Sequence, residues 1–213
     1  MKARTILIPV LLSLVPLGGC SWMRHGLYVL FGSGSTRTIE AEFDGLPGHT
    51  VAVVVYADQK ILYDYPDAPA RLTQGIADSL RKNVEDVCVV DPAKVLRFQI
   101  EHLYWDALDR TEIGRRLDAE YVLFVSLIEY TARRPGSAGL SQGQITAETK
   151  LYQTSLPERD AVVWSADPLL SVTFPEDRPG RLRQSELIRS ETESRFIRQL
   201  AWKFHEHKEE VQE

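Results

Sequence analysis

Apolar and polar positions divide the chain after residue 50 into short buried strands and amphipathic helices. Residues 51–56 and 87–90 are apolar at nearly every position and rich in valine, which is typical of strands that helices cover on both faces. Between them Leu72, Ile76 and Leu80 recur every four residues, which predicts an amphipathic helix. Two strands joined through a helix predict a parallel βαβ unit with a right-handed crossover.

The segments around this unit have weaker patterns. Residues 58–70 contain several aspartates and prolines, so they are expected to be largely loop. Residues 92–98 predict a helix with Pro92 in its first turn, where the missing N–H costs nothing. Asp109, with Glu112 three residues later, resembles a capping box and predicts a helix over 109–117.

The C-terminal half predicts three strands and a long helix. Residues 121–130 form a third apolar strand, and 145–152 alternate as a strand with one wet face does. Residues 161–174 are expected to pair antiparallel with it. Residues 185–207 predict a helix with one apolar ridge, whose charged residues, Glu193 among them, suit the wet face.

The elements follow the order β-α-β-(α)-α-β-β-β-α. This order predicts an α+β (α/β) fold with a mixed sheet of about five strands, helices packed on it and a long C-terminal helix. A single domain is expected over residues 50–208, followed by a frayed tail at 209–213.

The amino terminus has the layout of an export signal. Lys2 and Arg4 precede an apolar run over 6–17 that is too short to span a bilayer as a helix. The following Leu17-Gly18-Gly19-Cys20 resembles the lipobox of bacterial lipoproteins. The resemblance implies cleavage after a signal peptide at 1–19, a diacylglyceryl group and an acyl chain (palmitate) on Cys20, and a tether over 20–49. The alternative is an ordinary secretory signal with a chance cysteine.

The lipobox resemblance also bears on location. An Asp after the lipidated cysteine favours inner-membrane retention in the family's sorting pattern. Ser21 occupies that position here, so the expected location is the periplasmic face of a membrane, with the outer membrane favoured over the inner.

Composition excludes several classes of function. The formal charge is −5, and the absence of a basic patch argues against nucleic-acid binding. After Cys20 the one remaining cysteine is Cys88, so no internal disulfide can form, and Cys88 is expected to be a buried, inert thiol. His205 and His207 lie two apart, a spacing that places them on different sides of a helix. The sequence therefore predicts no metal site, no cofactor beyond the covalent lipid and no enzyme activity.

The segment at 58–70 is the best candidate for a functional surface. It follows the carboxyl end of the first strand, where open α/β sheets often bind ligands. Asp58, Tyr63, Tyr65 and Trp105 are the candidate contact residues, since aromatic residues dominate interface hot spots. The alternative is that these aromatic rings simply pack over helix edges.

Several phrases carry a resemblance to known periplasmic domains. They are residues 51–55, 75–80, 87–91 and 113–123. Together they resemble the domain found in the amino-terminal part of TolB, the globular part of the lipoprotein CsgG, and LpoB. The whole chain is also similar to a family of uncharacterised bacterial lipoproteins that share Asp91-Pro92 and residues 105–108.

The chain departs from this group in places. The family commonly has Leu-Gly-Ala-Asp-Tyr where this chain has Asp118 for the glycine and Glu120 for the aspartate. Neither 144–152 nor 161–174 has the alternating lipid-facing band of a pore hairpin, so a pore formed by this chain alone is rejected. The resemblance implies a non-enzymatic domain.

Three functions are then hypotheses. The first is a membrane-anchored interaction module in an envelope assembly for secretion, transport or cell-wall synthesis, with an envelope protein partner or self-association. The second is a small-ligand or glycan-binding lipoprotein that uses residues 58–70. The third is an envelope hydrolase, for which the sequence offers no set of catalytic residues.

Overall fold

The computed structural model describes residues 36–132, 140–176, 180–181 and 185–210 and divides into two units. The larger unit comprises residues 39–207. The smaller unit joins the two ends of the described chain, because strand β1 (Thr36–Ile39) pairs with strand β10 (His207–Glu210) in a two-stranded sheet. Residues 209–210, which the sequence places in a frayed tail, therefore lie in a strand.

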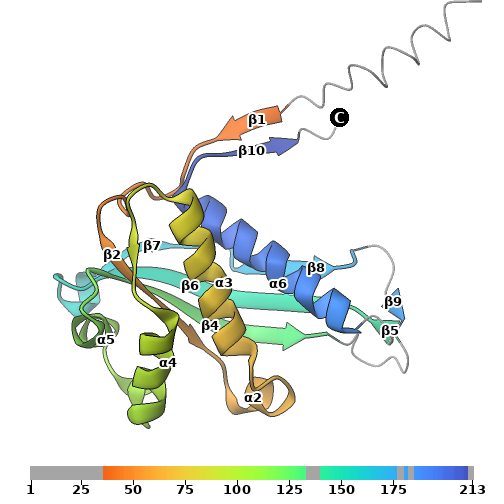
Figure 1. Cartoon of the computed structure of the whole chain (residues 1–213), viewed down its shortest axis with the longest axis horizontal. Helices are drawn as coiled ribbons and strands as arrows, with labels where there is room; N and C mark the ends of the chain where they lie inside the picture. Colours follow the sequence, from red (N-terminus) through yellow and green to blue (C-terminus); the bar gives the residue numbers. More distant parts are fainter. Residues whose placement is uncertain (1–35, 133–139, 177–179, 182–184, 211–213) are drawn as a thin grey trace, which may run out of the picture. The chain divides into compact units, whose positions relative to one another are not determined.

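The larger unit is built on a six-stranded mixed sheet of order β3-β2-β4-β6-β7, with β8 also paired to β6 (Figure 1). Its strands are β2 (Thr50–Tyr56), β3 (Cys88–Val89), β4 (Tyr121–Thr131), β6 (Gly143–Gln153), β7 (Val162–Ser165) and β8 (Leu170–Phe174). The first three are parallel, and β6 runs antiparallel to β4, β7 and β8. Two short strands, β5 (Leu140–Ser141) and β9 (Gly180–Arg181), pair separately. The predicted mixed sheet and its parallel first half are confirmed.

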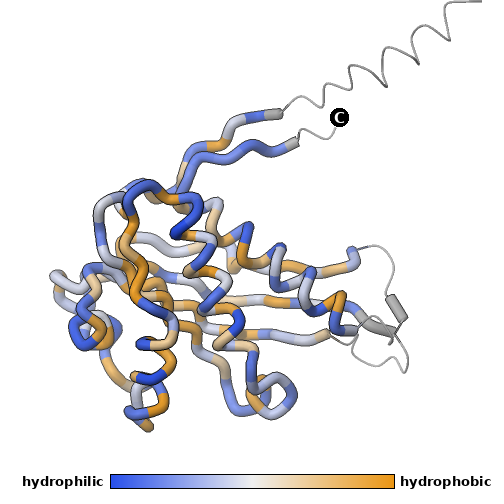
Figure 2. The backbone as a smooth tube through the Cα atoms, viewed as in Figure 1, coloured by the Kyte–Doolittle hydropathy of each residue, from blue (hydrophilic) through white to orange (hydrophobic). Residues whose placement is uncertain are grey.

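Helices cover both faces of the parallel half of this sheet. The helices are α2 (Gln59–Asp64), α3 (Ala68–Asn83), α4 (Pro92–Glu101), α5 (Arg110–Leu117) and α6 (Ser185–Ala201), with short 3-10 turns at η1 (Trp105–Ala107), η2 (Glu158–Asp160) and η4 (Trp202–Phe204). Helices α3 and α6 bury Leu72, Ile76 and Phe196 against one face, and α4 and α5 bury Val95 and Ile113 against the other. Strand β2, drawn mostly orange in Figure 2, is buried at all five interior positions because both faces are covered.

Strand β3 differs from its prediction. It is only two residues long and is exposed at Cys88 and half-buried at Val89, rather than buried. It pairs with β2 alone, at the edge of the sheet, so one side of the strand faces solvent. Cys88 is consequently an exposed free thiol, and the prediction of a buried one is wrong.

Residues 58–70 contain helices where a loop was expected. Asp58 caps helix α2, its carboxylate accepting a hydrogen bond from the Ile61 amide at 2.9 Å. Ile61 is buried in the core, and Pro69 lies in the first turn of α3, where proline is compatible with a helix. The aspartates and prolines that indicate a loop by composition here begin helices.

Two helix ends also differ in detail. Helix α6 ends at Ala201 rather than 207, because the next turn is 3-10 and His205 is extended. Asp109 does cap α5, accepting from the Thr111 amide at 2.8 Å. Glu112 does not complete a capping box, because it pairs with Arg115 and Arg116.

The departure at Asp118 from the family pattern is accommodated by the backbone. Asp118 ends α5 in the left-handed conformation, with φ 57° and ψ 40°, which aspartate visits more readily than most residues.

Over the described part of the chain, no helix is both long and apolar enough to cross a membrane.

Candidate functional site

The four candidate contact residues do not form one site. Asp58 is occupied as a helix cap, and Tyr63 on α2 is 89% exposed. The Tyr65 hydroxyl accepts a hydrogen bond from the Ala132 amide at 3.0 Å, so this tyrosine is fixed against the end of β4.

Trp105 lies on the opposite face of the sheet from Tyr65. Its ring contacts Tyr56 and Phe124 at centroid distances of 6.0 and 6.4 Å, and it packs against the core beneath α4 and α5. Tyr65 packs against the core beneath α3 and α6. The sequence analysis grouped Tyr65 and Trp105 as contact residues of one surface, but the two residues lie on opposite faces of the sheet.

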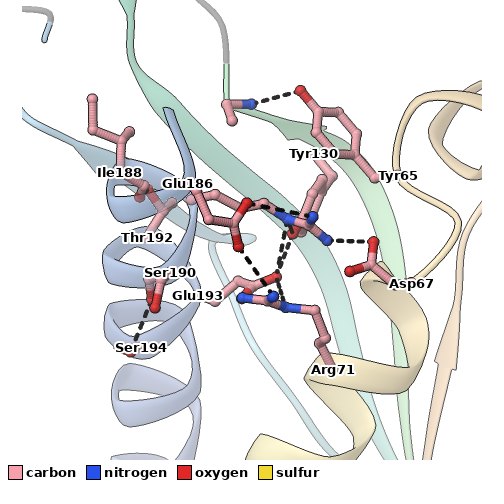
Figure 3. Close-up of polar contacts among 12 residues, drawn as sticks. Tyr65, Asp67, Arg71, Tyr130, Glu186, Ile188, Ser190, Thr192, Glu193 and Ser194 are labelled. Atoms are coloured by element: carbon pink, nitrogen blue, oxygen red, sulfur yellow. Dashed lines mark hydrogen bonds and ion pairs between the residues drawn. The ribbon is translucent and has the colours of Figure 1, made fainter. Parts of the chain in front are cut away.

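Next to Tyr65 lies a partly buried set of charges that the sequence did not indicate (Figure 3). The Arg71 guanidinium donates from Nε to both Glu193 oxygens, at 3.1 and 2.9 Å, and from Nη2 to Oε2 at 2.5 Å. The Tyr130 hydroxyl donates to Oε1 of the same carboxylate. Arg189 donates from Nε to the Tyr130 hydroxyl at 2.8 Å and from Nη2 to Asp67 at 2.6 Å. We call these five residues the ionic cluster.

The ionic cluster joins elements that are far apart in the sequence. Arg71 comes from α3, Glu193 and Arg189 from α6, and Tyr130 from β4. The rings of Tyr65 and Tyr130 meet edge to face at 4.9 Å. The cluster thus fixes α6 to α3 and to the end of β4, and it also holds the segment between α2 and α3 through Asp67.

The contacts within the cluster shift the pKa values of Tyr130, Arg189 and Asp67. Burial and the neighbouring Glu193 carboxylate raise the pKa of Tyr130 well above its usual range. Burial opposes the charge of Arg189, yet its hydrogen bonds to Asp67 and Tyr130 raise its pKa overall. The hydrogen bond from Arg189 lowers the pKa of Asp67. Each arginine is paired with carboxylates of the cluster, and the exposed Glu186 also lies within 4.0 Å of both, so we interpret the cluster as a structural joint.

The prediction that Glu193 lies on the wet face of α6 is wrong. Glu193 is only 5% exposed, because Arg71 and Tyr130 reach it from neighbouring elements. A buried carboxylate requires such partners. The one sequence feature that could have indicated burial of Glu193 is its position next to Thr192, which lies on the helix ridge that faces the core. Many exposed glutamates share that feature.

Exposed apolar side chains flank the carboxyl end of β2 on the two helices α2 and α4, which pack on opposite faces of the sheet. Tyr63 and Leu62 on α2 are 89% and 39% exposed, and Ile100, Leu103 and Tyr104 at the end of α4 are each more than three-quarters exposed. The side-chain amide of Gln99 donates to the Val55 carbonyl at 3.2 Å, which places the end of α4 beside the end of β2. We call these five residues the apolar edge; in Figure 2 its α4 part is the orange tip below α4.

The remaining candidate chemistry is sparse. His205 and His207 follow η4, where the His207 ring stacks on Trp202 at 4.5 Å. Within the described residues, no group of three or more His, Cys, Asp or Glu side chains could hold a metal ion. The lipidation prediction for Cys20 and its signal peptide falls outside the described residues.

Comparisons with known proteins give structural similarities only. No model of a known protein family matches the sequence, and no curated protein matches it. A single-substitution variant of the PelC dodecamer from Paraburkholderia phytofirmans is 21% identical, covers 80% of this chain and 98% of its own, and has a TM-score of 0.48. Lipoprotein GNA1162 from Neisseria meningitidis is 15% identical, covers 72% and 98%, and has a TM-score of 0.45. The hypothetical protein CT253 from Chlamydia trachomatis is 10% identical, covers 72% and 96%, and has a TM-score of 0.41. Identities and TM-scores this low carry no argument about activity or partners.

Proposed function

We propose that the chain is a lipid-anchored, non-enzymatic protein of the bacterial envelope that binds a protein partner through the apolar edge. The apolar edge carries this proposal. Four of its five large apolar side chains expose most of their surface around the carboxyl end of β2, and exposed apolar patches in soluble domains are commonly interaction sites. Tyr63 and Tyr104 are the residue type that is enriched in binding hot spots.

The lipobox restricts which partners can reach this edge. A diacylglyceryl group and an acyl chain on Cys20 would anchor the protein stably, since more than one buried chain is needed for lasting attachment. The tether between Cys20 and the first described strand is short, so the partner must itself lie near the membrane. Ser21 favours the outer membrane over the inner for this anchor.

The anchor and the edge are tested separately. Cys20→Ala should release the protein from the membrane fraction while leaving the domain folded, as judged by circular dichroism. If the variant still fractionates wholly with membranes, the lipid is not the anchor.

The partner is tested by photo-cross-linking in intact cells. A photoreactive amino acid replaces Tyr104, and a matched variant carries it at Leu187 on α6, which is 68% exposed and lies outside the edge. A discrete cross-linked species at 104 that is absent at 187 supports the proposal. Equal cross-linking at both positions, or none at 104, overturns it. A species of twice the mass of the chain would identify the partner as a second copy.

A further inference from the structure

A cleft opens on the face of the sheet that carries α4 and α5, at the place where this helical cover ends. Helices α4 and α5 pack mainly on β2 and β4, and of the two only α5 also reaches β6, near Tyr152. The cleft has a volume of about 290 Å³. It is lined by Tyr56, Asp106, Arg110, Phe124, Ser126, Glu148, Lys150 and Tyr152.

The cleft holds Arg110 in a fixed position. The guanidinium lies 4.0 Å from the centre of the Phe124 ring. Its Nη1 donates to the carbonyls of Asp106 and Leu108 at 2.9 and 2.6 Å. Its Nε and Nη2 have no partner among the described residues. These two donors are therefore positioned before any ligand arrives, which reduces the entropy lost on binding.

Three hydroxyl groups in the cleft also have no hydrogen-bond partner among the residues that the structure describes. Tyr56, Ser126 and Tyr152 all line the cavity, and none of their hydroxyls is hydrogen-bonded to a described residue. Burial raises the pKa of Tyr152, so its hydroxyl remains a neutral donor and acceptor. The tyrosine rings add apolar surface beside these polar groups, and Trp105 supports Tyr56 from behind.

The charges of the cleft cancel. Lys150 pairs with Glu148 at 2.7 Å, and Arg110 and Asp106 add one charge of each sign. A strongly anionic or cationic ligand would therefore gain little net attraction. A ligand with many hydroxyls and an apolar face would use all of the groups present, because hydroxyls accept from guanidinium and ammonium groups and donate to carboxylates, while aromatic rings bury an apolar face.

We propose that this cleft binds one sugar ring of an uncharged glycan, with Arg110, Tyr152 and Ser126 as its hydrogen-bonding residues. Its volume lies at the lower limit for ligand pockets, which fits a single ring rather than a buried oligosaccharide. The glycan would continue over the polar surface of β6. This assignment moves ligand binding away from residues 58–70, none of which lines the cleft, and it does not depend on a protein partner at the apolar edge.

The test uses the full lipidated chain in lipid nanodiscs and saturation-transfer difference NMR. The probes are cellotetraose, maltotetraose and chitotetraose, with trigalacturonate as the anionic comparison and empty nanodiscs as the background. We expect saturable transfer to at least one uncharged saccharide and weaker transfer to trigalacturonate. Tyr152→Phe and Ser126→Ala, which remove only a hydroxyl, should each weaken binding about 3- to 10-fold, the effect of losing one hydrogen bond.

Ser194→Ala on α6 is the matched control for Ser126→Ala, because it removes an exposed serine hydroxyl that does not line the cleft. It should leave binding unchanged. The proposal is overturned if no uncharged saccharide gives saturable transfer at 20 mM (about the weakest affinity of interest), if trigalacturonate binds more tightly than all of them, or if Tyr152→Phe and Ser126→Ala bind as the unsubstituted protein does.

Discussion

Replacing Glu193 by alanine should destabilise the domain more than any other single change in the ionic cluster. The carboxylate is the shared acceptor for Arg71 and Tyr130, and it lies 3.6 Å from the Arg189 guanidinium. Its removal leaves the two guanidinium groups with one remaining shared anion, the exposed Glu186 carboxylate, which lies 3.3 Å from Arg71 and 4.0 Å from Arg189. Asp67 can compensate Arg189 only, because it is hydrogen-bonded to that residue.

The expected loss follows from the burial of the partners. Breaking a buried ion pair by removing one member costs about 3–5 kcal/mol. The side chains of Glu193 and Arg189 are 6% and 12% exposed, but that of Arg71 is 37% exposed. Water can therefore hydrate Arg71 in the variant, so the loss should lie at the lower end, about 3 kcal/mol. Glu193→Gln keeps the shape and one acceptor oxygen, and should cost about 1–2 kcal/mol.

The measurement is the free energy of unfolding in urea at pH 7, followed by tryptophan fluorescence. Glu191→Ala is the matched control on the same helix. Its pair with Arg195 is much more exposed than Glu193, at 42% and 29%, and is spaced i, i+4, so it should cost only about 0.3–0.5 kcal/mol. If Glu193→Ala costs less than twice as much as this control, the cluster does not join α6 to α3.

Three other predictions concern packing and pH. Gly114→Ala should destabilise by about 1–2 kcal/mol in urea unfolding, because a Cβ there would lie 2.1 Å from the Thr154 methyl group and overpacking outweighs the gain of about 1 kcal/mol in helix propensity. The free energy of unfolding should fall as pH rises above about 10, because Tyr130 ionises near its ordinary pKa in the unfolded state but keeps its proton to higher pH in the folded state. Thermal melting points between about pH 9 and 11.5 measure this fall. Tyr130→Phe should make the fall shallower. The free energy of unfolding should also decline below about pH 4. Arg189 lowers the pKa of Asp67 in the folded state, so the unfolded state takes up a proton first as pH falls. Asp67→Asn should make the melting point less sensitive to pH between about 4 and 2.5.

Each of these predictions has a control in the chain. Gly75→Ala would meet only the side chain of Ile197, whose terminal methyl is the nearest atom and can rotate away, so its effect should be near zero. Tyr63→Phe removes an exposed phenol and should leave the alkaline fall intact. Asp64→Asn changes an exposed carboxylate that has no ion pair among the described residues, and the acid decline should persist. Equal effects in a variant and its control would contradict the physical reason given for that variant.

The fold could be predicted where one periodicity dominates. The buried strand β2 and helix α3 were predicted because valine runs and a four-residue apolar repeat have few competing interpretations. Helix α2 was missed because composition cannot separate an aspartate that caps a helix from one that forms a turn. The difference lies in whether the Ile61 amide turns back toward Asp58, which depends on Ile61 reaching the core.

The ionic cluster could not be predicted because its partners are set by tertiary packing. Arg71 and Glu193 are 122 residues apart, and each alone suits the wet side of an amphipathic helix. They meet because α3 and α6 lie side by side on one face of the sheet (Figure 1). The cleft was missed for the same reason, since β6, η1 and the end of β2 converge there only when the sheet has formed.

A β-bulge in β4 explains how one strand serves both the cleft and the ionic cluster. Along a regular strand, residues separated by an even number point to the same face, so Tyr130 would lie on the same side as Phe124 and Ser126. The pairing with β6 instead shifts between Leu127 and Glu129, which inserts one extra residue and reverses the alternation beyond it. Phe124 thus belongs to the core beneath α4 and α5, and Tyr130 to the core beneath α3 and α6. Without that extra residue in the register, the Tyr130 hydroxyl would not reach Glu193, and the carboxylate would lose a buried donor that the helices cannot replace.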